Sequence, residues 1–261
     1  MTQPLLKVQN VTRRFGGLVA VDNVSFDVMQ GEVLTIIGPN GAGKSTLFNV
    51  ISRIYPESAG QLFFEGVDLG KTPPHKIASL GIARTFQNIE LFEHATVLQN
   101  LLIGHHRLNR TGFWSNLLFL NSTRQEEHVS RLRIEEVIDF LGLQKYRDSF
   151  VSGLPYGIRK VVELGRALSM DPKLLLLDEP SSGLNPEETE EMAFWIKDLV
   201  NDLGITVLMV EHDMSLVSRV SSRVVAMNQG QVIAIGTSAQ VQSHPDVIKA
   251  YIGAEDEDAN D

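Results

Sequence analysis

Short apolar runs separated by turn residues fill the first third of the chain, a pattern typical of β-strands. We expect strands in four stretches, which are LLKVQNV (5–11), VSFDV (24–28), GEVLTIIG (31–38) and GQLFFEG (60–66). A glycine-rich turn follows the third of these and leads into KSTLFNVISRI (44–54), which we predict to be a helix. The N-terminal part is therefore predicted to be rich in β-structure, with one helix placed directly after a strand.

Helical periodicity dominates the middle of the chain, from about residue 87 to residue 152. The clearest case is SRLRIEEVIDFLGL (130–143), where five apolar residues cover largely one helical face: Leu132, Ile134, Val137, Ile138 and Leu141. An apolar stripe on an otherwise polar helix is normally the face that packs against a core. We therefore interpret this stripe as packing and give it no binding role.

Helices and strands alternate in the last third of the chain. Helices are predicted at YGIRKVVELGRALSM (156–170) and PEETEEMAFWIKDLVNDLG (186–204), and buried strands at KLLLLDEP (173–180) and ITVLMVEH (205–212). The stretch RVVAMNQGQVIAIG (223–236) is expected to be a hairpin that turns at Asn-Gln-Gly. Buried strands that alternate with helices favour an α/β fold with a mainly parallel sheet.

The composition narrows the possible functions. With 261 residues, 43% of them apolar, the chain is long enough for one large α/β domain or a core with an inserted subdomain. A net charge of −9 argues against bulk nucleic-acid binding, and the absence of cysteine excludes disulfides and thiolate metal sites. The N-terminus lacks the apolar core of a signal peptide, and no apolar window reaches the roughly 18 residues of a membrane span. The acidic end AEDEDAND (254–261) is expected to be disordered.

The stretch GPNGAGKST (38–46) matches the phosphate-binding pattern G-x-x-x-x-G-K-[ST]. It follows a predicted strand and opens a predicted helix, which is the context that this loop requires. Its glycines let backbone N–H groups converge on phosphate oxygens, and the helix adds the positive end of its dipole. We expect Lys44 to reach the β- and γ-phosphates and Ser45 to hold Mg²⁺. The expected phosphate-binding residues are Asn40, Gly41, Gly43, Lys44, Ser45 and Thr46.

Two carboxylates follow a run of four leucines in LLLLDEP. Ligands collect at the carboxyl ends of parallel strands, so Asp178 is placed to bind Mg²⁺, directly or through water. Glu179 is then placed to orient and deprotonate a water aimed at the γ-phosphate, unless the pair only caps the next turn. The stretch TVLMVEHD repeats the arrangement on a second strand, where His212 could contact the γ-phosphate region. A lone histidine there, like the lone Gln87, would ordinarily be a structural or surface residue.

Taken together, the motifs resemble those of ABC transporter ATP-binding subunits. GPNGAGKST, RTFQN, LPYGIRK, LLLLDEP, SSGLN and VEHDM stand in that family's order, and the resemblance extends to about Gly253. It implies a single ABC ATPase domain over 5–253, with a mostly parallel central sheet, an N-terminal antiparallel β subdomain and an inserted α-helical subdomain. The core would cover about 5–86 and 160–253, and the helical subdomain about 88–159. ATP and Mg²⁺ are the implied ligands.

The resemblance also implies roles for single residues. Phe15 falls where an aromatic ring stacks on adenine, with packing at a strand edge as the alternative. Gln87 becomes the Q-loop glutamine, which contacts Mg²⁺ and the attacking water, and His212 becomes the switch histidine. The D-loop (182–185) ends in Asn185, where many relatives have aspartate. Asparagine keeps an acceptor and can still cap a turn.

The largest departure from the family is LPYGI (154–158), where most relatives have Leu-Ser-Gly-Gly-Gln. The serine and glutamine that would meet the opposite subunit's ATP are absent. Tyr156 and Gly157 stand instead at the start of a predicted helix, whose positive end can still face a phosphate. Arg159 and Lys160 add positive charge nearby.

Further stretches, among them EPSSGLNPEET and HPDVIKAYIG, are similar to the ATPases of branched-chain amino acid importers, and specifically to the longer of two paired ATPases. The implied partners are a second ABC ATPase in a heterodimer or homodimer, membrane permease subunits and a periplasmic solute-binding protein, with no nucleic acid. The implied location is peripheral, at the cytoplasmic face of the inner or plasma membrane. Other hydrophobic or polar amino acids are alternative solutes, and urea and short-chain amide importers share this subgroup. A lipid or lipopolysaccharide export ATPase and a soluble ABC ATPase are further alternatives.

An insertion in the helical region, about 110–124, contains FWSNLLFLNSTR (113–124). Its large apolar residues Trp114 and Phe119 are expected to pack the insertion on its own subdomain. The alternative is contact with the permease or with the membrane surface.

Overall fold

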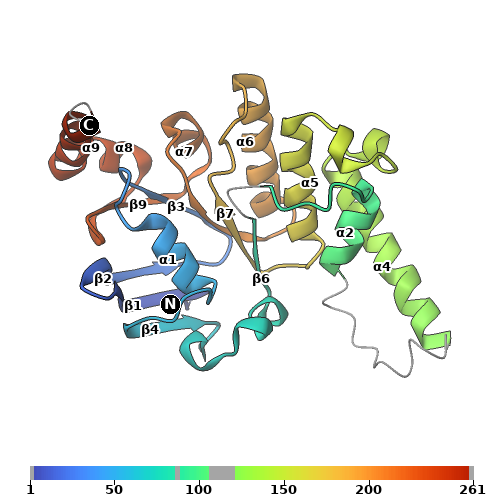
Figure 1. The fold of residues 1–261 in the computed structure, drawn as a ribbon, viewed down its shortest axis with the longest axis horizontal. Helices are drawn as coiled ribbons and strands as arrows, with labels where there is room; N and C mark the ends of the chain where they lie inside the picture. Colours follow the sequence, from blue (N-terminus) through green and yellow to red (C-terminus); the bar gives the residue numbers. More distant parts are fainter. Residues whose placement is uncertain (1–2, 86–88, 106–120, 259–261) are drawn as a thin grey trace. The chain divides into compact units, whose positions relative to one another are not determined.

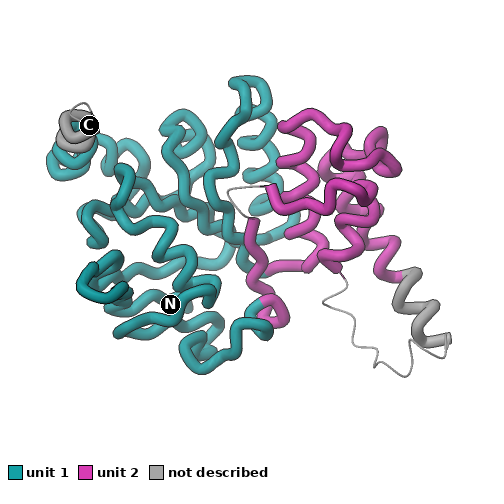
Figure 2. Tube along the Cα trace, viewed as in Figure 1, with its two compact units in different colours: residues 1–77, 173–261 teal, residues 78–172 magenta. Residues whose placement is uncertain are grey.

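The computed structural model describes residues 3–85, 89–105 and 121–258. The chain divides into two compact units, one formed by residues 1–77 and 173–261 and the other by residues 78–172 (Figure 2). The first unit is thus assembled from both ends of the sequence, and the second is a single continuous segment between them.

An antiparallel sheet is formed by the N-terminal part of the first unit. Its strands are β1 (Leu6–Phe15), β2 (Leu18–Val28), β4 (Ala59–Phe64) and β5 (Val67–Asp68), in the spatial order β2-β1-β4-β5 (Figure 1). β1 and β2 form a hairpin in which Phe15 pairs with Leu18 at the turn and Leu6 with Val28 at the open end. The predicted antiparallel β subdomain is confirmed.

A second sheet supplies the core of the first unit. Five of its strands run in the order β10-β9-β3-β8-β7, with the bounds β3 (Val33–Ile37), β7 (Leu174–Asp178), β8 (Thr206–Val210), β9 (Arg223–Asn228) and β10 (Gln231–Gly236). The first four of these in chain order are parallel, and β10 returns antiparallel to β9 as the predicted hairpin. Every residue of β3, β7 and β8 is buried, as expected for strands of a parallel sheet that is covered on both faces.

The helices of the first unit are α1 (Lys44–Ile51), α6 (Pro186–Asn201), α7 (Met214–Val220), α8 (Ser238–Gln242) and α9 (Pro245–Asp258), with 3₁₀ turns η1 (Leu69–Lys71) and η2 (Pro74–Lys76). α1 contacts strands of both sheets. It ends before residue 54, where the sequence predicts its end, because Arg53 adopts a left-handed backbone conformation with φ 61°.

α9 extends into the acidic end of the chain. Its helix runs to Asp258, whereas the sequence predicts disorder from residue 254. The stretch contains Ala and Glu, which are good helix formers, and it continues a helix that is already packed through Val247 and Tyr251.

The second unit is mainly helical. It contains β6 (Ile82–Arg84), α2 (Val97–His105), α4 (Asn121–Phe140) and α5 (Tyr156–Leu168), with 3₁₀ turns η3 (Ala78–Leu80), η5 (Gln144–Tyr146) and η6 (Val151–Gly153). α2 packs against α4 and α5. Within the described residues, no helix is long and apolar enough to cross a membrane.

The apolar stripe predicted on α4 is confirmed with one exception. Ile134, Val137, Ile138 and Leu141 are buried, but Leu132 is 55% exposed. Leu132 is two residues before Ile134, a step of about 200° around a helix, so it points away from the buried face. Its inclusion in the stripe was wrong.

Candidate functional site

The turn between β3 and α1 carries the glycine-rich motif. Gly41 and Gly43 have φ 76° and 93°, in the left-handed region that favours glycine, and Gly43 is also the N-cap of α1. A methyl group on Gly43 would collide with the carbonyl oxygen of Ala20 on β2. At position 43, both the backbone conformation and the lack of space therefore require glycine. The turn brings N–H groups to the N-terminus of a helix.

Lys44 is folded back over this turn. Its Nζ donates hydrogen bonds to the carbonyl oxygens of Gly38 at 2.7 Å and Pro39 at 2.9 Å. Burial lowers the pKa of Lys44 below its ordinary value, while the negative charges of Glu179 and Asp178 act in the opposite direction. A phosphate group that replaced the two carbonyls would give the buried ammonium a charged partner in place of neutral ones.

The carboxyl end of β7 positions the acidic pair. Asp178 is the last residue of the strand and is only 4% exposed. Glu179 follows it, and its backbone N–H still donates to the carbonyl of Val210 on β8 at 3.0 Å. Glu179 has φ 49°, a left-handed conformation that costs a non-glycine residue on the order of 1 kcal/mol. This turn sets the direction in which the Glu179 carboxylate leaves the strand.

His212 lies just beyond the end of β8, the strand next to β7. Its Nδ1 is 3.8 Å from Oε2 of Glu179 and 3.8 Å from Oε2 of Glu211, and its side chain is 59% exposed. Since β3, β7 and β8 are parallel neighbours, their carboxyl ends gather Lys44, the acidic pair and His212 at one edge of the sheet. Residues separated by more than 160 positions in the sequence thus meet at one site.

A comparison with known protein families shows which family the chain belongs to. A family model described as "ABC transporter" matches residues 21–182, which is more than half of the chain. The chain belongs to the ABC transporter family. A second model, described as "Branched-chain amino acid ATP-binding cassette transporter", matches residues 231–257. As a member of this family, the cassette is an ATPase whose hydrolysis is coupled to transport.

Curated relatives align with the cassette over nearly its whole length. It is 40% identical over 253 residues to the high-affinity branched-chain amino acid transport ATP-binding protein LivG of Escherichia coli strain K12, which covers 97% of this chain and 99% of that protein. It is 36% identical to a probable LivG of Archaeoglobus fulgidus, with 97% and 96% covered.

Solved structures give the same result. A nucleotide-free ATP-binding cassette from an ABC transporter superposes with a TM-score of 0.83, at 34% identity over 95% of this chain and 99% of that one. A cassette in its ADP conformation gives a TM-score of 0.84, at 35% identity over 97% and 100%. The predicted α/β P-loop ATPase fold is confirmed.

Phe15 ends β1 and remains partly exposed, at 38%. Its ring makes an edge-to-face contact with Tyr55, with 5.2 Å between centroids, and the guanidinium of Arg13 lies 4.4 Å from its centroid. The ring is therefore supported by two neighbours without being enclosed, which is compatible both with a stacking surface and with edge packing.

Asn185 of the D-loop is the N-cap of α6. Its side chain accepts from the N–H of Glu188 at 3.0 Å, and the Glu188 carboxylate accepts from the N–H of Asn185 at 3.0 Å. This reciprocal capping box confirms that asparagine can take the capping role here. The loop before it is closed by a bond from the N–H of Ser182 to the carbonyl of Glu179 at 3.1 Å.

The modified signature lies in the second unit. Pro155 is the N-cap of α5, and Gly157 is buried while Tyr156 is exposed. The two basic residues that follow are already engaged. Arg159 pairs with Glu93 at 3.0 Å, and Lys160 is only 4% exposed, with its Nζ 6.0 Å from the ring centre of Tyr156.

Three predicted residues fall outside the part of the chain that the structure describes. These are Gln87 of the Q-loop and Trp114 and Phe119 of the insertion. Their predicted roles stay predictions.

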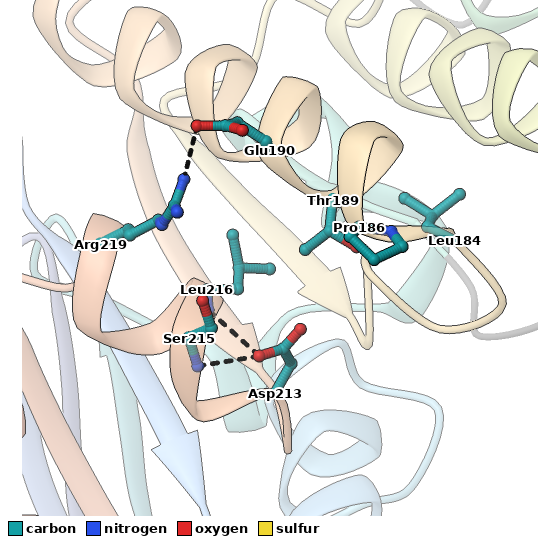
Figure 3. A pocket seen from close by; sticks show the side chains of 8 residues that line it. All are labelled: Leu184, Pro186, Thr189, Glu190, Asp213, Ser215, Leu216 and Arg219. Carbon is teal, nitrogen blue, oxygen red and sulfur yellow. Dashed lines mark hydrogen bonds and ion pairs between the residues drawn. The ribbon is translucent and has the colours of Figure 1, made fainter.

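A cavity of about 400 Å³ lies beside the D-loop in the first unit. Its wall consists of Leu184, Pro186, Thr189, Glu190, Asp213, Ser215, Leu216 and Arg219 (Figure 3). No residue of the glycine-rich turn lines it. The cavity is therefore lined mainly by α6 and α7, with Leu184 from the loop after β7 and Asp213 from the loop after β8.

Glu211 also lies in this region, and the sequence alone assigned it no function. It is fully buried between the two loops, with a hydrogen bond from Ser181 on one side and one from His212 on the other. An acidic residue directly after an apolar strand, repeating Glu179 after β7, is the sequence signal that points to it.

Proposed function

We propose that this chain is the ATP-hydrolysing subunit of an importer for branched-chain amino acids. The observation that carries the proposal is 40% identity over 97% of the chain to a protein named for high-affinity branched-chain amino acid transport. The match of residues 231–257 to a model named for the same transporters supports it independently of the ATPase motifs.

In the proposed mechanism, the glycine-rich turn and Lys44 hold the phosphates of ATP. The residues assigned to this are Asn40, Gly41, Gly43, Lys44, Ser45 and Thr46. The buried amine of Lys44 already has two acceptors, so binding exchanges carbonyl oxygens for more strongly charged phosphate oxygens. Phe15 supports the adenine ring by stacking, since its ring is only partly covered by Tyr55 and Arg13.

The residues present fit a Mg²⁺ ion. The Ser45 hydroxyl and the Asp178 carboxylate are hard oxygen ligands, and Gln87 is the third proposed ligand. The described residues contain no cluster of three or more His, Cys, Asp or Glu side chains that could hold a metal by themselves. A metal with few protein ligands is typical of Mg²⁺, which keeps waters and binds substrate phosphates. Bound there, it would neutralise charge that develops on the phosphates.

Glu179 and His212 are the proposed catalytic pair. The Glu179 carboxylate orients a water and accepts its proton, and His212, 3.8 Å away, contacts the γ-phosphate as the water attacks. Both side chains leave the ends of buried strands, so their backbones are fixed before the substrate binds.

The assembly that we propose contains a second ABC ATPase, membrane permease subunits and a periplasmic solute-binding protein, with this chain at the cytoplasmic face of the membrane. Closure of the ATPase pair is driven by the higher affinity of the closed state for ATP, and hydrolysis reopens it. The altered signature at Tyr156 and Gly157 would serve the ATP bound by the partner, through the N-terminal end of α5. The two ATP sites of a heterodimer would then hydrolyse at different rates.

A reconstituted transporter tests the solute. We expect the complex that contains this chain to accumulate radiolabelled leucine, isoleucine and valine in the presence of ATP. Uptake should stop when Glu179 is replaced by glutamine. Uptake of urea or a short-chain amide instead would leave the ATPase assignment intact and reject the amino acid assignment. Outward movement of a lipid would reject the importer as a whole.

A further inference from the structure

The carboxylate of Glu211 is buried at the carboxyl end of β8. None of its side-chain surface is exposed, and its backbone N–H donates to the carbonyl of Ile36 on β3 at 3.2 Å. A carboxylate removed from water in this way is costly unless hydrogen bonds satisfy its oxygens. The hydrogen bonds of Glu211 should therefore indicate the role of this residue.

The two oxygens of this carboxylate serve two different loops. Oε1 accepts from the backbone N–H and from the hydroxyl of Ser181, at 2.9 and 2.5 Å, in the loop after β7. Oε2 accepts from the backbone N–H groups of His212 and Asp213, at 2.7 and 3.0 Å, in the loop after β8. One side chain thus joins the loop that begins with Glu179 to the loop that carries His212.

The connection continues beyond His212. Asp213, whose N–H is held by Glu211, caps α7 by accepting from the N–H groups of Ser215 at 2.8 Å and Leu216 at 3.3 Å (Figure 3). The backbone of His212 is therefore fixed on one side by β8 and Glu211 and on the other by a capped helix. Its exposed side chain projects from a rigid base.

We propose that Glu211 is a positioning residue for ATP hydrolysis, which holds the loops after β7 and β8 together so that Glu179 and His212 act on the same phosphate. The proposal rests on the catalytic roles given to Glu179 and His212 above. Glu211 acts through backbone N–H groups of both loops and the hydroxyl of Ser181, and has no solvent-exposed surface with which to reach a nucleotide. Its loss should consequently lower turnover and leave nucleotide affinity nearly unchanged.

Glu211→Gln is the decisive variant, because the amide has almost the same shape but only one acceptor oxygen. Whichever way the amide lies, its NH₂ group faces backbone N–H donors of one loop, and that loop loses its acceptor. In the assembled ATPase pair we expect kcat to fall at least about tenfold, while KM for ATP stays within about twofold. Ser181→Ala, which removes only the hydroxyl donor, should lower kcat less and keeps the test available if Glu211→Gln does not fold.

The matched control is Glu32→Gln at the opposite end of the sheet. Glu32 is also a buried carboxylate, which accepts from the N–H of Met29 at 2.6 Å and pairs with Arg223 at 3.1 Å. It precedes β3 and contacts neither loop, so its replacement should lower the melting temperature and leave kcat within about twofold. This separates general destabilisation from loss of positioning.

A double-mutant cycle completes the test. If Glu211 acts through His212 and the Glu179 loop, Glu211→Gln should lower kcat much less in a His212→Ala background than in the wild type. Independent, multiplicative effects would overturn the proposal, as would an unchanged kcat in Glu211→Gln or an equal fall in Glu32→Gln. If Glu179→Gln and His212→Ala themselves leave hydrolysis unchanged, the proposed catalytic pair fails instead, and the two failures are distinguishable.

Discussion

The Nδ1 atom of His212 lies 3.8 Å from Oε2 of Glu179, although 32 residues stand between the two in the sequence. The contact arises because β7 and β8 are parallel neighbours whose carboxyl ends coincide, with Asp178 paired to Val210. Each residue follows the end of its own strand. The geometry of the pair that we propose to be catalytic is therefore set by the sheet.

Glu179→Gln should abolish turnover and preserve ATP binding. The amide has the shape of the carboxylate but does not accept the proton of the attacking water, and loss of a general base typically costs about 10²–10⁴-fold in rate. Steady-state hydrolysis and equilibrium binding of ATP measure the two effects separately. Glu190→Gln is the control, since this exposed carboxylate pairs with Arg219 on the surface at 2.8 Å. Undiminished hydrolysis in Glu179→Gln would remove Glu179 as the base.

Lys44→Ala should weaken ATP binding about tenfold or more, because it removes the charge that faces the β- and γ-phosphates. The folded chain should tolerate the change, since among the described residues the hydrogen bonds of the buried ammonium go to the neutral carbonyls of Gly38 and Pro39. Titration with a fluorescent ATP analogue measures the affinity. Lys173→Ala provides the same change of charge at a surface lysine that pairs with Glu65. Equal affinities for wild type and Lys44→Ala contradict the phosphate-loop assignment.

Phe15→Ala should raise KM for ATP, because an aromatic stack on a base contributes about 1–3 kcal/mol. Phe15→Trp keeps an aromatic face and should retain most of the affinity. The alternative role is packing against Tyr55 and Arg13, which would appear as a lower melting temperature. A KM that does not move, together with a loss of stability, would leave Phe15 as a packing residue only.

Asn185→Ala should destabilise the fold by about 1 kcal/mol, since it removes the acceptor that caps the N–H of Glu188. Asn185→Asp keeps an acceptor and adds a favourable charge at a helix N-terminus. Its stability should equal or exceed that of the wild type. Chemical denaturation of the three proteins measures the differences, and an Asn185→Ala chain as stable as the wild type would show that the capping box contributes nothing.

The sequence by itself determined the local elements and the glycine-rich turn. Apolar runs located β3, β7 and β8, and the glycine pattern located the turn before α1, because these depend on side-chain periodicity and on backbone freedom at single positions. It also placed Asp178, Glu179 and His212 at the carboxyl ends of predicted strands. The ends of helices and the exposure of Leu132 were harder to predict from the sequence. Helix ends depend on local backbone geometry, and exposure depends on which neighbours cover a helix face.

Only the tertiary structure decided which residues of these elements come into contact. The strand order places β8 between β3 and β7, and this order brings Glu211 into contact with Ser181, while the second carboxylate oxygen of Glu211 binds its own loop at His212. Nothing in the local pattern around Glu211 distinguishes a buried carboxylate that joins two loops from an exposed one at the end of a strand. That difference is created by packing, because the burial of Glu211 and its bonds to Ser181 depend on segments far apart in the chain.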